Sequence, residues 1–371
     1  MRHRGPDDCG RWTSLDGRVT LGHRRLSVID LSARGRQPMS DPSGRLWITF
    51  NGEIYNHDEL RRELVWRGYP FRSTSDTEVL LAAYRAWGTD CLSRLNGMFA
   101  FGIYDTEAER LFLARDRAGE KPLFYSRWDG RFLFASELKC LLAAPGFPRR
   151  LNPRAFEQYL AYGYVSGDLC LLEGVCKLPP AHALTYYLNS KQLRIWRYWN
   201  VPAWDESTTS EDDLVDELAQ LLEDSVRRQL VADVPLAILL SSGVDSSLVT
   251  AMAARVSSKP VKTFTISFPG HGHYDEARQA RLVARHFATE HTELAAEPAS
   301  VALLPELARQ YDEPVADSSL VPSFLVSRLV RQQATVALSG DGGDELFGGY
   351  AHYQSLQRRH IAKHIPAAVR Q

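Results

Sequence analysis

The 371-residue sequence has little of what marks secreted, membrane-spanning or nucleic-acid-binding proteins. Its five cysteines are odd in number and include no Cys-x-x-Cys pair, which argues against a disulfide framework or a thiolate zinc site. No apolar run approaches the roughly 18 residues that a membrane span needs, and the charged N-terminus has no apolar signal core. The 44 Lys and Arg offset 45 Asp and Glu, so no overall field favours nucleic acid or a membrane as partner. These absences predict a cytoplasmic protein in a reducing compartment.

The composition is that of an ordinary globular protein, with 44% hydrophobic and 24% charged residues. At about 150 residues per domain, the length predicts two or three domains. A polar stretch at 205–210 marks a change in composition. We therefore expect a first domain at 1–200, a linker at 201–213 and a second domain at 214–371.

The first domain reads as many short strands with a few helices, which predicts an α+β fold with layered antiparallel sheets. A strand at 45–50 is expected to stop at the turn dipeptide Asn51-Gly52, and helices are expected at 58–66 and 76–87. Aromatic-rich runs separated by short polar turns predict one antiparallel meander of four strands, at 98–104, 111–114, 122–125 and 131–134.

The second domain alternates apolar strands with helices, which indicates a parallel sheet covered on both faces. We expect a first helix capped by Ser210, strands at 234–240, 261–268 and 335–338, and helices at 248–255 and 275–287. Further helical sequence is expected before the last strand. Acidic residues at 275 and 276 open one helix, where the helix dipole alone would favour them.

The most informative stretch is the Ser/Gly loop, residues 239–247, which reads Leu-Leu-Ser-Ser-Gly-Val-Asp-Ser-Ser. Small residues between a buried strand and a helix gather backbone N–H groups at the positive end of the helix, and the hydroxyls add donors. This arrangement suits a polyphosphate. The chain has no Gly-Lys-Ser/Thr, which excludes a Walker-type P-loop. An ordinary strand-to-helix turn with a serine cap is the alternative.

A second loop, the Asp/Gly loop at 338–350, holds five glycines and three acidic residues after a short apolar strand. Glycines let the backbone approach a ligand closely, and carboxylates bind a hard cation such as Mg²⁺. A solvated acidic loop is the alternative. Together, the two loops point to chemistry on a magnesium nucleotide.

In the first domain, four kinds of group could bind the head of an amino acid. The Asn51 amide and the Gly52 N–H can form an oxyanion hole, and Arg25 can fork onto a carboxylate. Glu53 and Asp76 could receive an ammonium group. Each residue alone is equally well read as a surface or turn residue, so only their joint occurrence carries the hypothesis.

Further short segments occur in a fixed order beside the two loops, at 4–8, 25–27, 37–39, 51–56, 75–78, 97–101, 115–117, 120–123 and 136–139. Through them the sequence resembles the glutamine-hydrolysing asparagine synthetases over essentially its whole length. The resemblance implies an N-terminal-nucleophile (Ntn) αββα sandwich followed by an α/β parallel-sheet PP-loop ATP pyrophosphatase domain, like the adenine nucleotide α hydrolases.

The resemblance also implies a reaction. Glutamine is hydrolysed in the first domain and ammonia passes to the second, where ATP and Mg²⁺ adenylate aspartate to β-aspartyl-AMP. Ammonia then displaces AMP to give asparagine. Adenylation is needed because a free carboxylate is a poor acyl donor. Glutamine, aspartate and ATP are thus the expected partners, with a homodimer as the expected assembly.

Residue roles follow from the same resemblance. Asn51 and Gly52 would form the oxyanion hole, Arg25 would bind the carboxylate of glutamine, and Glu53 and Asp76 its amino group. Asp341 would be catalytic, and Asp245 and Asp344 would meet Mg²⁺. The expected ATP and pyrophosphate contacts are Leu240, Ser241, Ser242, Gly243, Asp245, Ser246, Ser247, Ile266, Ser339 and Gly340.

Three departures from the family pattern stand out. The family nucleophile is an N-terminal cysteine about thirty residues before the Arg-Gly-Pro-Asp segment, and Cys9 cannot replace it because it has no free α-amino group to act as base. Ser242 stands where glycine is usual, at a cost of about 1–2 kcal/mol if its φ is positive. The chain stops about twenty residues after Tyr350, before a helical region and its catalytic lysine. We therefore expect an asparagine synthetase truncated at both ends that lacks glutaminase activity.

Two alternatives remain at this point. One is a β-lactam-synthetase-like enzyme that closes an amide ring, although Arg25, Asn51, Glu53 and Asp76 would have no use in it. The other is an inactive ATP-binding fragment. Glutamine-dependent thermal shifts would test the first, and ATP–pyrophosphate exchange that needs aspartate would test the second.

Overall fold

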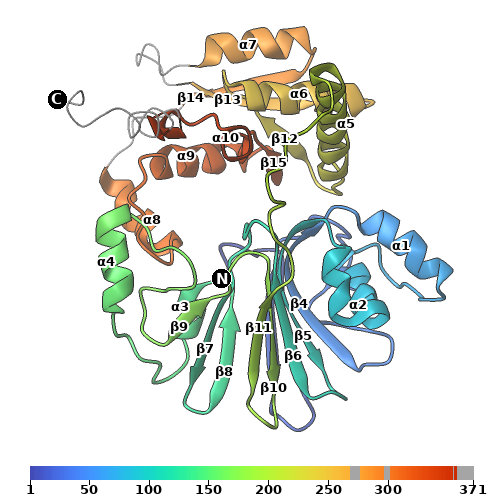
Figure 1. Cartoon of the computed structure of the whole chain (residues 1–371), viewed down its shortest axis with the longest axis vertical. Coiled ribbons are helices and arrows are strands. Elements are labelled where there is room, and N and C mark those ends of the chain that lie inside the picture. The colour runs from blue at the N-terminus through green and yellow to red at the C-terminus, as the bar shows by residue number, and fades with distance from the viewer. Residues whose placement is uncertain (268–275, 296–300, 354, 357–371) are drawn as a thin grey trace. The chain divides into compact units, whose positions relative to one another are not determined.

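A computed structural model describes residues 1–267, 276–295, 301–353, 355 and 356 (Figure 1). The chain forms two compact units. Unit 1 comprises Met1–Thr208, Val231–Val234 and Ala299–Phe324, and unit 2 comprises Thr209–Leu230, Pro235–Pro298 and Leu325–Gln371. The boundaries at 200 and 214 stay a prediction. Among the described helices, none is both long and apolar enough to span a bilayer.

Unit 1 is built on a six-stranded antiparallel sheet in the order β11-β10-β6-β5-β4-β3. Its strands are β3 (Met39–Ser40), β4 (Leu46–Ile54), β5 (Gly97–Asp105), β6 (Arg110–Arg115), β10 (His182–Tyr187) and β11 (Leu193–Arg197). Helices α1 (His57–Trp66) and α2 (Asp76–Trp87) cover one face, where Leu64 and Leu80 pack with Ile48 of β4 and Phe112 of β6. This confirms the two helices expected from the sequence.

Two smaller sheets cover the opposite face. One pairs β1 (Asp8–Thr13) with β2 (Thr20–Arg25), and the other has the order β8-β7-β9, with β7 (Phe124–Trp128), β8 (Arg131–Ala135) and β9 (Val175–Lys177). Trp12 stacks on Trp47 at a centroid distance of 4.3 Å, and Phe132 stacks on Tyr186 at 4.5 Å. All four rings belong to one hydrophobic cluster, so both small sheets pack on the same face of the large one.

Helices α3 (Leu138–Leu142) and α4 (Pro153–Tyr162) lie between β8 and β9 in the chain. Leu138 and Leu141 of α3 pack with Leu133 of β8 in a separate cluster. A helix layer, a large sheet and a second sheet layer are therefore present, and a full second helix layer of an αββα sandwich stays a prediction.

Two local expectations were wrong. The Asn51-Gly52 dipeptide does not end a strand, because β4 continues to Ile54 with Asn51 opposite Ala100 and Gly52 opposite Phe99 of β5. The predicted four-stranded meander is split: β5 pairs with β6 and β7 with β8, but β6 takes β10 as its other neighbour.

Unit 2 contains the predicted parallel sheet, in the order β14-β13-β12-β15. Its strands are β12 (Leu236–Leu239), β13 (Lys262–Ser267), β14 (Glu290–Ala295) and β15 (Val336–Leu338). Helices α5 (Glu211–Gln229) and α6 (Val244–Val256) pack on one face around Ile238, and α9 (Leu320–Val330) packs on the other around Phe264. The sheet is thus covered on both faces, as the sequence predicts.

Three further α-helices in the described part of the chain are α7 (Ala277–His286), α8 (Leu304–Gln310) and α10 (Gly343–Phe347). Ser210 caps α5 by accepting the N–H of Asp213, as expected. The expected strand at 261–268 and helix at 275–287 are found, but residues 268 and 275 lie outside the described part of the chain. Strand β14 was missed, because its residues were taken as part of a helical stretch.

Candidate functional site

Gly52 occupies a position in β4 that a larger residue could not fill. Its φ of 155° is one that L-residues rarely adopt. A Cβ there would overlap the carbonyl oxygen of Met98 and would lie 2.7 Å from the Cα of Phe99. The neighbouring Asn51 amide donates to the Ser136 hydroxyl at 3.5 Å, just beyond the end of β8. The two residues predicted to form an oxyanion hole are therefore held by β5 and by the residue after β8.

Two carboxylates lie close to this strand end in a desolvated environment. Glu53 and Asp76 are both more than 90% buried. Burial and the nearby charge of Asp76 raise the pKa of Glu53 to about 7, against the opposing effect of Lys121. Burial also raises the pKa of Asp76, although its Oδ2 accepts the N–H of Ile54 at 3.0 Å. Within the described part of the chain neither carboxylate forms an ion pair. A cation that binds here would therefore offset the cost of burying both charges.

Arg25 is also buried, but in the structure it holds a loop. Its Nη1 and Nη2 donate to the carbonyl oxygens of Ser32, at 3.1 Å, and of Ile29 and Asp30, at 3.1 and 2.5 Å. The Asp30 carboxylate in turn accepts the N–H of Thr74 at 2.9 Å, two residues before Asp76. Hydrogen bonds thus connect Arg25 to the start of α2, where Asp76 lies.

The residues that shape the loop at 116–121 were not assigned a role from the sequence. The buried Asp116 accepts four backbone N–H groups, from Phe99, Gly119, Glu120 and Lys121, at 2.6 to 3.1 Å. Arg115 donates to three carbonyl oxygens on the same loop and on the residue after β9. This loop carries Lys121, whose pKa is lowered by burial. In the sequence, the Arg-Asp-Arg segment at 115–117 was the feature that could have indicated this structural role.

In unit 2 the Ser/Gly loop runs from the end of β12 into the start of α6. The Ser246 hydroxyl accepts the N–H of Ser241 at 3.1 Å and lies 2.8 Å from the Ser241 hydroxyl, which accepts the N–H of Gly243 at 3.1 Å. Ser242 has no positive φ, so it carries no left-handed strain. Its N–H donates to the carboxylate of Glu276 at 3.2 Å. The loop already holds one anionic group.

Two further expected nucleotide contacts lie at this sheet, Leu240 directly after β12 and Ile266 on β13. Leu240 is buried against Ala280 and Ala284 of α7, and its N–H donates to the carbonyl oxygen of Phe264 of β13. Ile266 lies near the carboxyl end of β13, the same edge of the sheet that Leu240 reaches. Ligands of open α/β sheets bind at this edge.

The Asp/Gly loop lies directly against the Ser/Gly loop. A Cβ on Gly340 would come within 2.7 Å of the Ser246 nitrogen, and one on Gly343 would overlap the carboxylate of Asp245. A Cβ on Gly349 would overlap the carboxylate of Asp344. The two loops are thus in contact, with Gly340 and Gly343 against Ser246 and Asp245, and with Asp344 against Gly349 of its own loop. That Asp245 and Asp344 meet Mg²⁺ stays a prediction.

Asp341 and Ser339 lie at the start of the Asp/Gly loop. The N–H of Asp341 donates to the Ser339 hydroxyl at 3.3 Å, and the Asp341 side chain is exposed. Among the described residues, no three or more His, Cys, Asp or Glu side chains gather as a metal site. Two carboxylates still fit Mg²⁺, because this ion commonly completes its coordination with water and substrate phosphates.

Comparisons with known proteins agree with this geometry. A family model described as a glutamine amidotransferase domain matches residues 1–199, and one described as asparagine synthase matches residues 217–371. The chain is 35% identical to a putative glutamine-hydrolysing asparagine synthetase 2 of Methanocaldococcus jannaschii, over 100% of this chain and 75% of that protein. The chain belongs to the glutamine-hydrolysing asparagine synthetase family.

Another member of the asparagine synthetase family, the glutamine-hydrolysing asparagine synthetase 3 of Bacillus subtilis, is 37% identical over 96% of this chain. The chain spans 60% of the length of that relative. Among solved structures, it is similar to a glutamine phosphoribosylpyrophosphate amidotransferase of B. subtilis, with a TM-score of 0.35, 16% identity and coverage of 86% and 76% of the two chains.

Proposed function

We propose that the chain serves the synthesis of asparagine from aspartate, with glutamine bound in unit 1 and MgATP bound in unit 2. The observation that carries the glutamine half is the pair of buried carboxylates, Glu53 and Asp76, beside Asn51 and Gly52. A desolvated carboxylate pair is costly unless a cation joins it. The α-ammonium group of an amino acid is such a cation.

The other groups around this pair suit the rest of a glutamine molecule. Arg25 supplies a positive charge for the carboxylate of glutamine. Its bonds to the carbonyl oxygens of Ser32, Ile29 and Asp30 orient it and leave one N–H of Nη1 and that of Nε to donate. The Asn51 amide and the Gly52 N–H are donors suited to the oxygen on which charge develops as an amide is attacked. These contacts would hold glutamine by its head group and present its side-chain amide to β4.

The nucleotide half of the proposal rests on the two adjoining loops of unit 2. Backbone N–H groups and the hydroxyls of Ser241, Ser246 and Ser247 are suited to the pyrophosphate of ATP. Asp245 and Asp344 would hold Mg²⁺, which supplies charge neutralisation on the phosphates when bound. The carboxylate of aspartate would then attack the α-phosphorus of ATP, forming a C–O–P bond and releasing pyrophosphate. We propose that Asp341, Ser339 and Gly340 face this reaction.

The glutamine half can be tested by isothermal titration of glutamine into the chain. Glu53→Gln and Asp76→Asn should each weaken binding at least tenfold, because each removes a charge that faces the ammonium group. Glu173→Gln, which changes an exposed carboxylate, is the matched control and should bind normally. Absence of binding at millimolar glutamine, or equal affinity in all variants, would contradict the proposal.

Glutamine affinity should also depend on pH in a defined direction. Because the pKa of Glu53 is raised to about 7, its carboxylate is largely protonated at pH 6 and charged at pH 8. Binding of an ammonium group needs the charged form, so affinity should rise with pH, by up to tenfold per unit below the pKa. The Glu53→Gln variant should lose this slope. A flat profile in the unmodified chain would show that Glu53 does not face the ligand.

The synthetase half can be tested by ATP–pyrophosphate exchange. Exchange that requires both aspartate and Mg²⁺ is expected, and Asp245→Asn should abolish it. Exchange supported by another carboxylate but not by aspartate would favour a different amide-forming ligase, such as a β-lactam-synthetase-like enzyme. ATP binding without exchange would favour a binding role alone.

We further propose a cytoplasmic location, no nucleic-acid partner and a homodimer. The formal charge of −1 supports the absence of a nucleic-acid partner, because no surplus of basic residues is available for a phosphate backbone. The homodimer rests on the family resemblance, and sedimentation of the purified chain would test it.

A further inference from the structure

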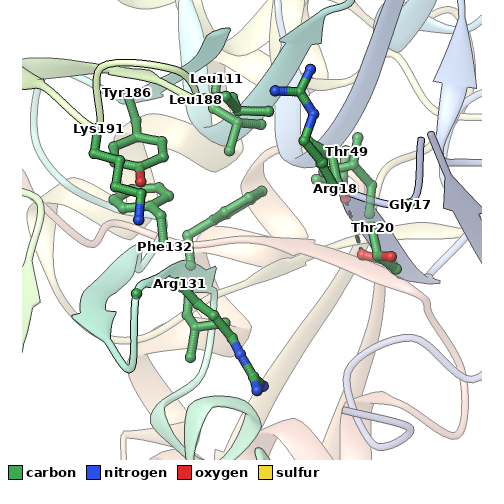
Figure 2. Close-up of a pocket in the computed structure, with 16 residues that line it drawn as sticks. Gly17, Arg18, Thr20, Thr49, Leu111, Arg131, Phe132, Tyr186, Leu188 and Lys191 are labelled. Carbon is green, nitrogen blue, oxygen red and sulfur yellow. Dashed lines mark hydrogen bonds between the residues drawn. The ribbon is translucent and has the colours of Figure 1, made fainter. Parts of the chain in front are cut away.

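The cations at the two ends of strand β2 differ in their partners. Residues 20–22, at the start of the strand, help to line a hollow of about 630 Å³, which Figure 2 shows. Two cations at this hollow, Arg18 and Arg131, are already paired with nearby carboxylates. Arg25, the last residue of β2, donates to three carbonyl oxygens and forms no ion pair within the part of the chain that the structure describes. Its charge is therefore available to an anionic ligand, provided that its guanidinium group is well oriented.

One peptide unit links Arg25 to a residue far along the chain. The carbonyl oxygen of Ile29 accepts a hydrogen bond from Nη2 of Arg25 at 3.1 Å. The N–H of the same peptide unit, which belongs to Asp30, donates to Oδ2 of Asp233 at 2.8 Å. Because a trans peptide unit is planar, its C=O and N–H point in opposite directions, so the two bonds together fix its orientation. A carboxylate bound to the N–H also polarises the unit and strengthens its carbonyl oxygen as an acceptor.

The backbone of Asp30 has a conformation that needs support. Its φ of 57° lies in the left-handed region, which non-glycine residues adopt at an energetic cost. In this conformation its carbonyl oxygen also accepts from Nη2 of Arg25, at 2.5 Å, and its carboxylate accepts the N–H groups of Ser32 and Thr74. A Cβ on Gly35 would overlap Nη2 of Arg25, so the loop closes tightly on the guanidinium group. The direction of Arg25 therefore depends on the conformation of this loop.

Asp233 is bound to the loop at two points. Besides accepting the N–H of Asp30, it donates its own N–H to the carbonyl oxygen of Val28 at 3.0 Å. Residues 231–234 belong to unit 1, although in the chain they follow α5 and precede β12. They lie outside residues 1–199, which the glutamine amidotransferase model matches. The support of Arg25 thus includes a residue from beyond that matched range.

We propose that Asp233 is a positioning residue of the glutamine site. Through the peptide unit between Ile29 and Asp30 it fixes the guanidinium group of Arg25, so that the N–H groups that the loop leaves free keep one direction. A ligand with an α-carboxylate gains from this fixed direction, because less motion has to be frozen when it binds. This role of Asp233 rests on the proposed binding of glutamine by Arg25. Asp233 should therefore matter for the α-carboxylate and not for the rest of the ligand.

Isothermal titration of the full chain with two ligands tests this role. The ligands are glutamine and L-glutaminamide, in which an amide group replaces the α-carboxylate. Asp233→Ala should weaken glutamine binding about fivefold, because a bond to a charged acceptor that orients Arg25 is lost, and should leave the binding of L-glutaminamide unchanged. Asp233→Asn keeps an acceptor oxygen for the N–H of Asp30 and should bind glutamine within about twofold of the unmodified chain. Asp216→Ala, which removes an exposed carboxylate from α5, is the matched control and should bind both ligands normally.

A second comparison changes Arg25 itself. Arg25→Lys keeps a positive charge but loses the planar guanidinium group that the loop orients. In this background Asp233→Ala should cause no further loss of glutamine affinity, because Asp233 acts through the guanidinium group. A substitution that only unfolded unit 1 would instead weaken the binding of both ligands in either background.

Four results would overturn the role of Asp233 and leave the proposed function intact. These are equal glutamine affinity of Asp233→Ala and the unmodified chain, equal weakening for the two ligands, failure of Asp233→Asn to restore binding, and an undiminished effect of Asp233→Ala in the Arg25→Lys background. Absence of glutamine binding by the unmodified chain is a different result, which would contradict the proposed function of unit 1 and the role of Asp233 together.

Discussion

Single side chains in unit 1 position the candidate glutamine site mainly through bonds to backbone. Arg25, Arg115 and Asp116 together contact ten backbone groups, while Glu53 and Asp76 have no charged partner within the described residues. The first three therefore fix the shape of the site and the last two carry its unbalanced charge. Substitutions of Arg115 and Asp116 should therefore affect stability and those of Glu53 and Asp76 ligand affinity, whereas substitution of Arg25, which we also propose to bind the carboxylate of glutamine, should affect both.

Gly52→Ala tests the close approach of β4 and β5. The positive φ costs alanine about 1–2 kcal/mol, and the overlap with Met98 adds about 1–3 kcal/mol. We expect the free energy of unfolding to fall by about 2–4 kcal/mol in urea denaturation. Gly22→Ala, at an open position, should be neutral within about 0.5 kcal/mol. Equal stability of both variants would show that β5 yields to a side chain at Gly52.

Glu276→Gln tests whether an acidic side chain competes for the Ser/Gly loop. Its carboxylate accepts the N–H of Ser242, a donor that we assign to pyrophosphate. Removing this charge should tighten ATP binding several-fold, because like charges close to each other repel. Fluorescence titration with an ATP analogue measures the change, and Glu290→Gln, at an exposed position, is the control. Unchanged or weaker binding would contradict competition.

At the residue scale, the sequence grouped Asn51, Gly52, Glu53 and Asp76 by their chemistry, and the structure places them along or against one strand end. Their roles stay a prediction. The Asn-Gly dipeptide also suits a turn, however, and it is the pairing with Phe99 and Ala100 of β5, more than 40 residues away, that places it in a strand. Burial of Glu53 depends on packing that no local pattern records.

At the scale of elements, strand and helix types were predictable where the apolar pattern was strong. Helix α2 and strand β12 have such patterns and were found close to the expected residues. Strand β14 reads Glu-His-Thr-Glu-Leu-Ala and was missed, because an edge strand with one exposed side keeps many polar residues. The pairing of β6 with β10 depends on a contact across 70 residues, so the sequence suggested the nearer strand β7 instead.

The loop at 116–121 gives a prediction at this scale. Asp116→Asn keeps one acceptor oxygen but turns an amide N–H₂ toward two N–H donors, so at least two hydrogen bonds are lost. Because hydrogen bonds to a charged acceptor contribute about 1.5–3 kcal/mol each, the loss of two should lower the free energy of unfolding by about 3–6 kcal/mol. Asp90→Asn, an exposed carboxylate, is the control. A change below about 0.5 kcal/mol would show that the loop has another support.

At the scale of the whole molecule, each unit is assembled from segments that are not consecutive. Residues 299–324 follow β14 of unit 2 in sequence but belong to unit 1. Asp312 accepts the N–H of Leu138 at 2.9 Å and pairs with Lys139 at 3.1 Å, and Glu313 pairs with Lys177. Composition and motifs could not indicate that residues 299–324 belong to unit 1, because they mark a domain boundary only where the chain becomes polar.

Glu313→Gln tests the attachment of this segment. The change keeps the acceptor for the N–H of Leu171 but removes the anion that pairs with the largely buried Lys177. We expect a loss of about 2 kcal/mol, less than for a fully buried pair because Lys177 still donates to Val165. Hydrogen exchange should speed up at 304–313 and 165–177 but not in β12 or β13. Equal acceleration in those strands would show that the effect is global.

The exchange of segments has a practical consequence for anyone who divides this protein at its linker. A protease that cuts between 201 and 210, or a gene split there, breaks the covalent link between the strands of unit 1 and residues 299–324. The non-covalent contacts between them remain. The first fragment expressed alone would lack Asp312 and Glu313 and would expose Lys139 and Lys177. Co-expressed fragments, by contrast, should purify together through residues 231–234 and 299–324, which both belong to unit 1.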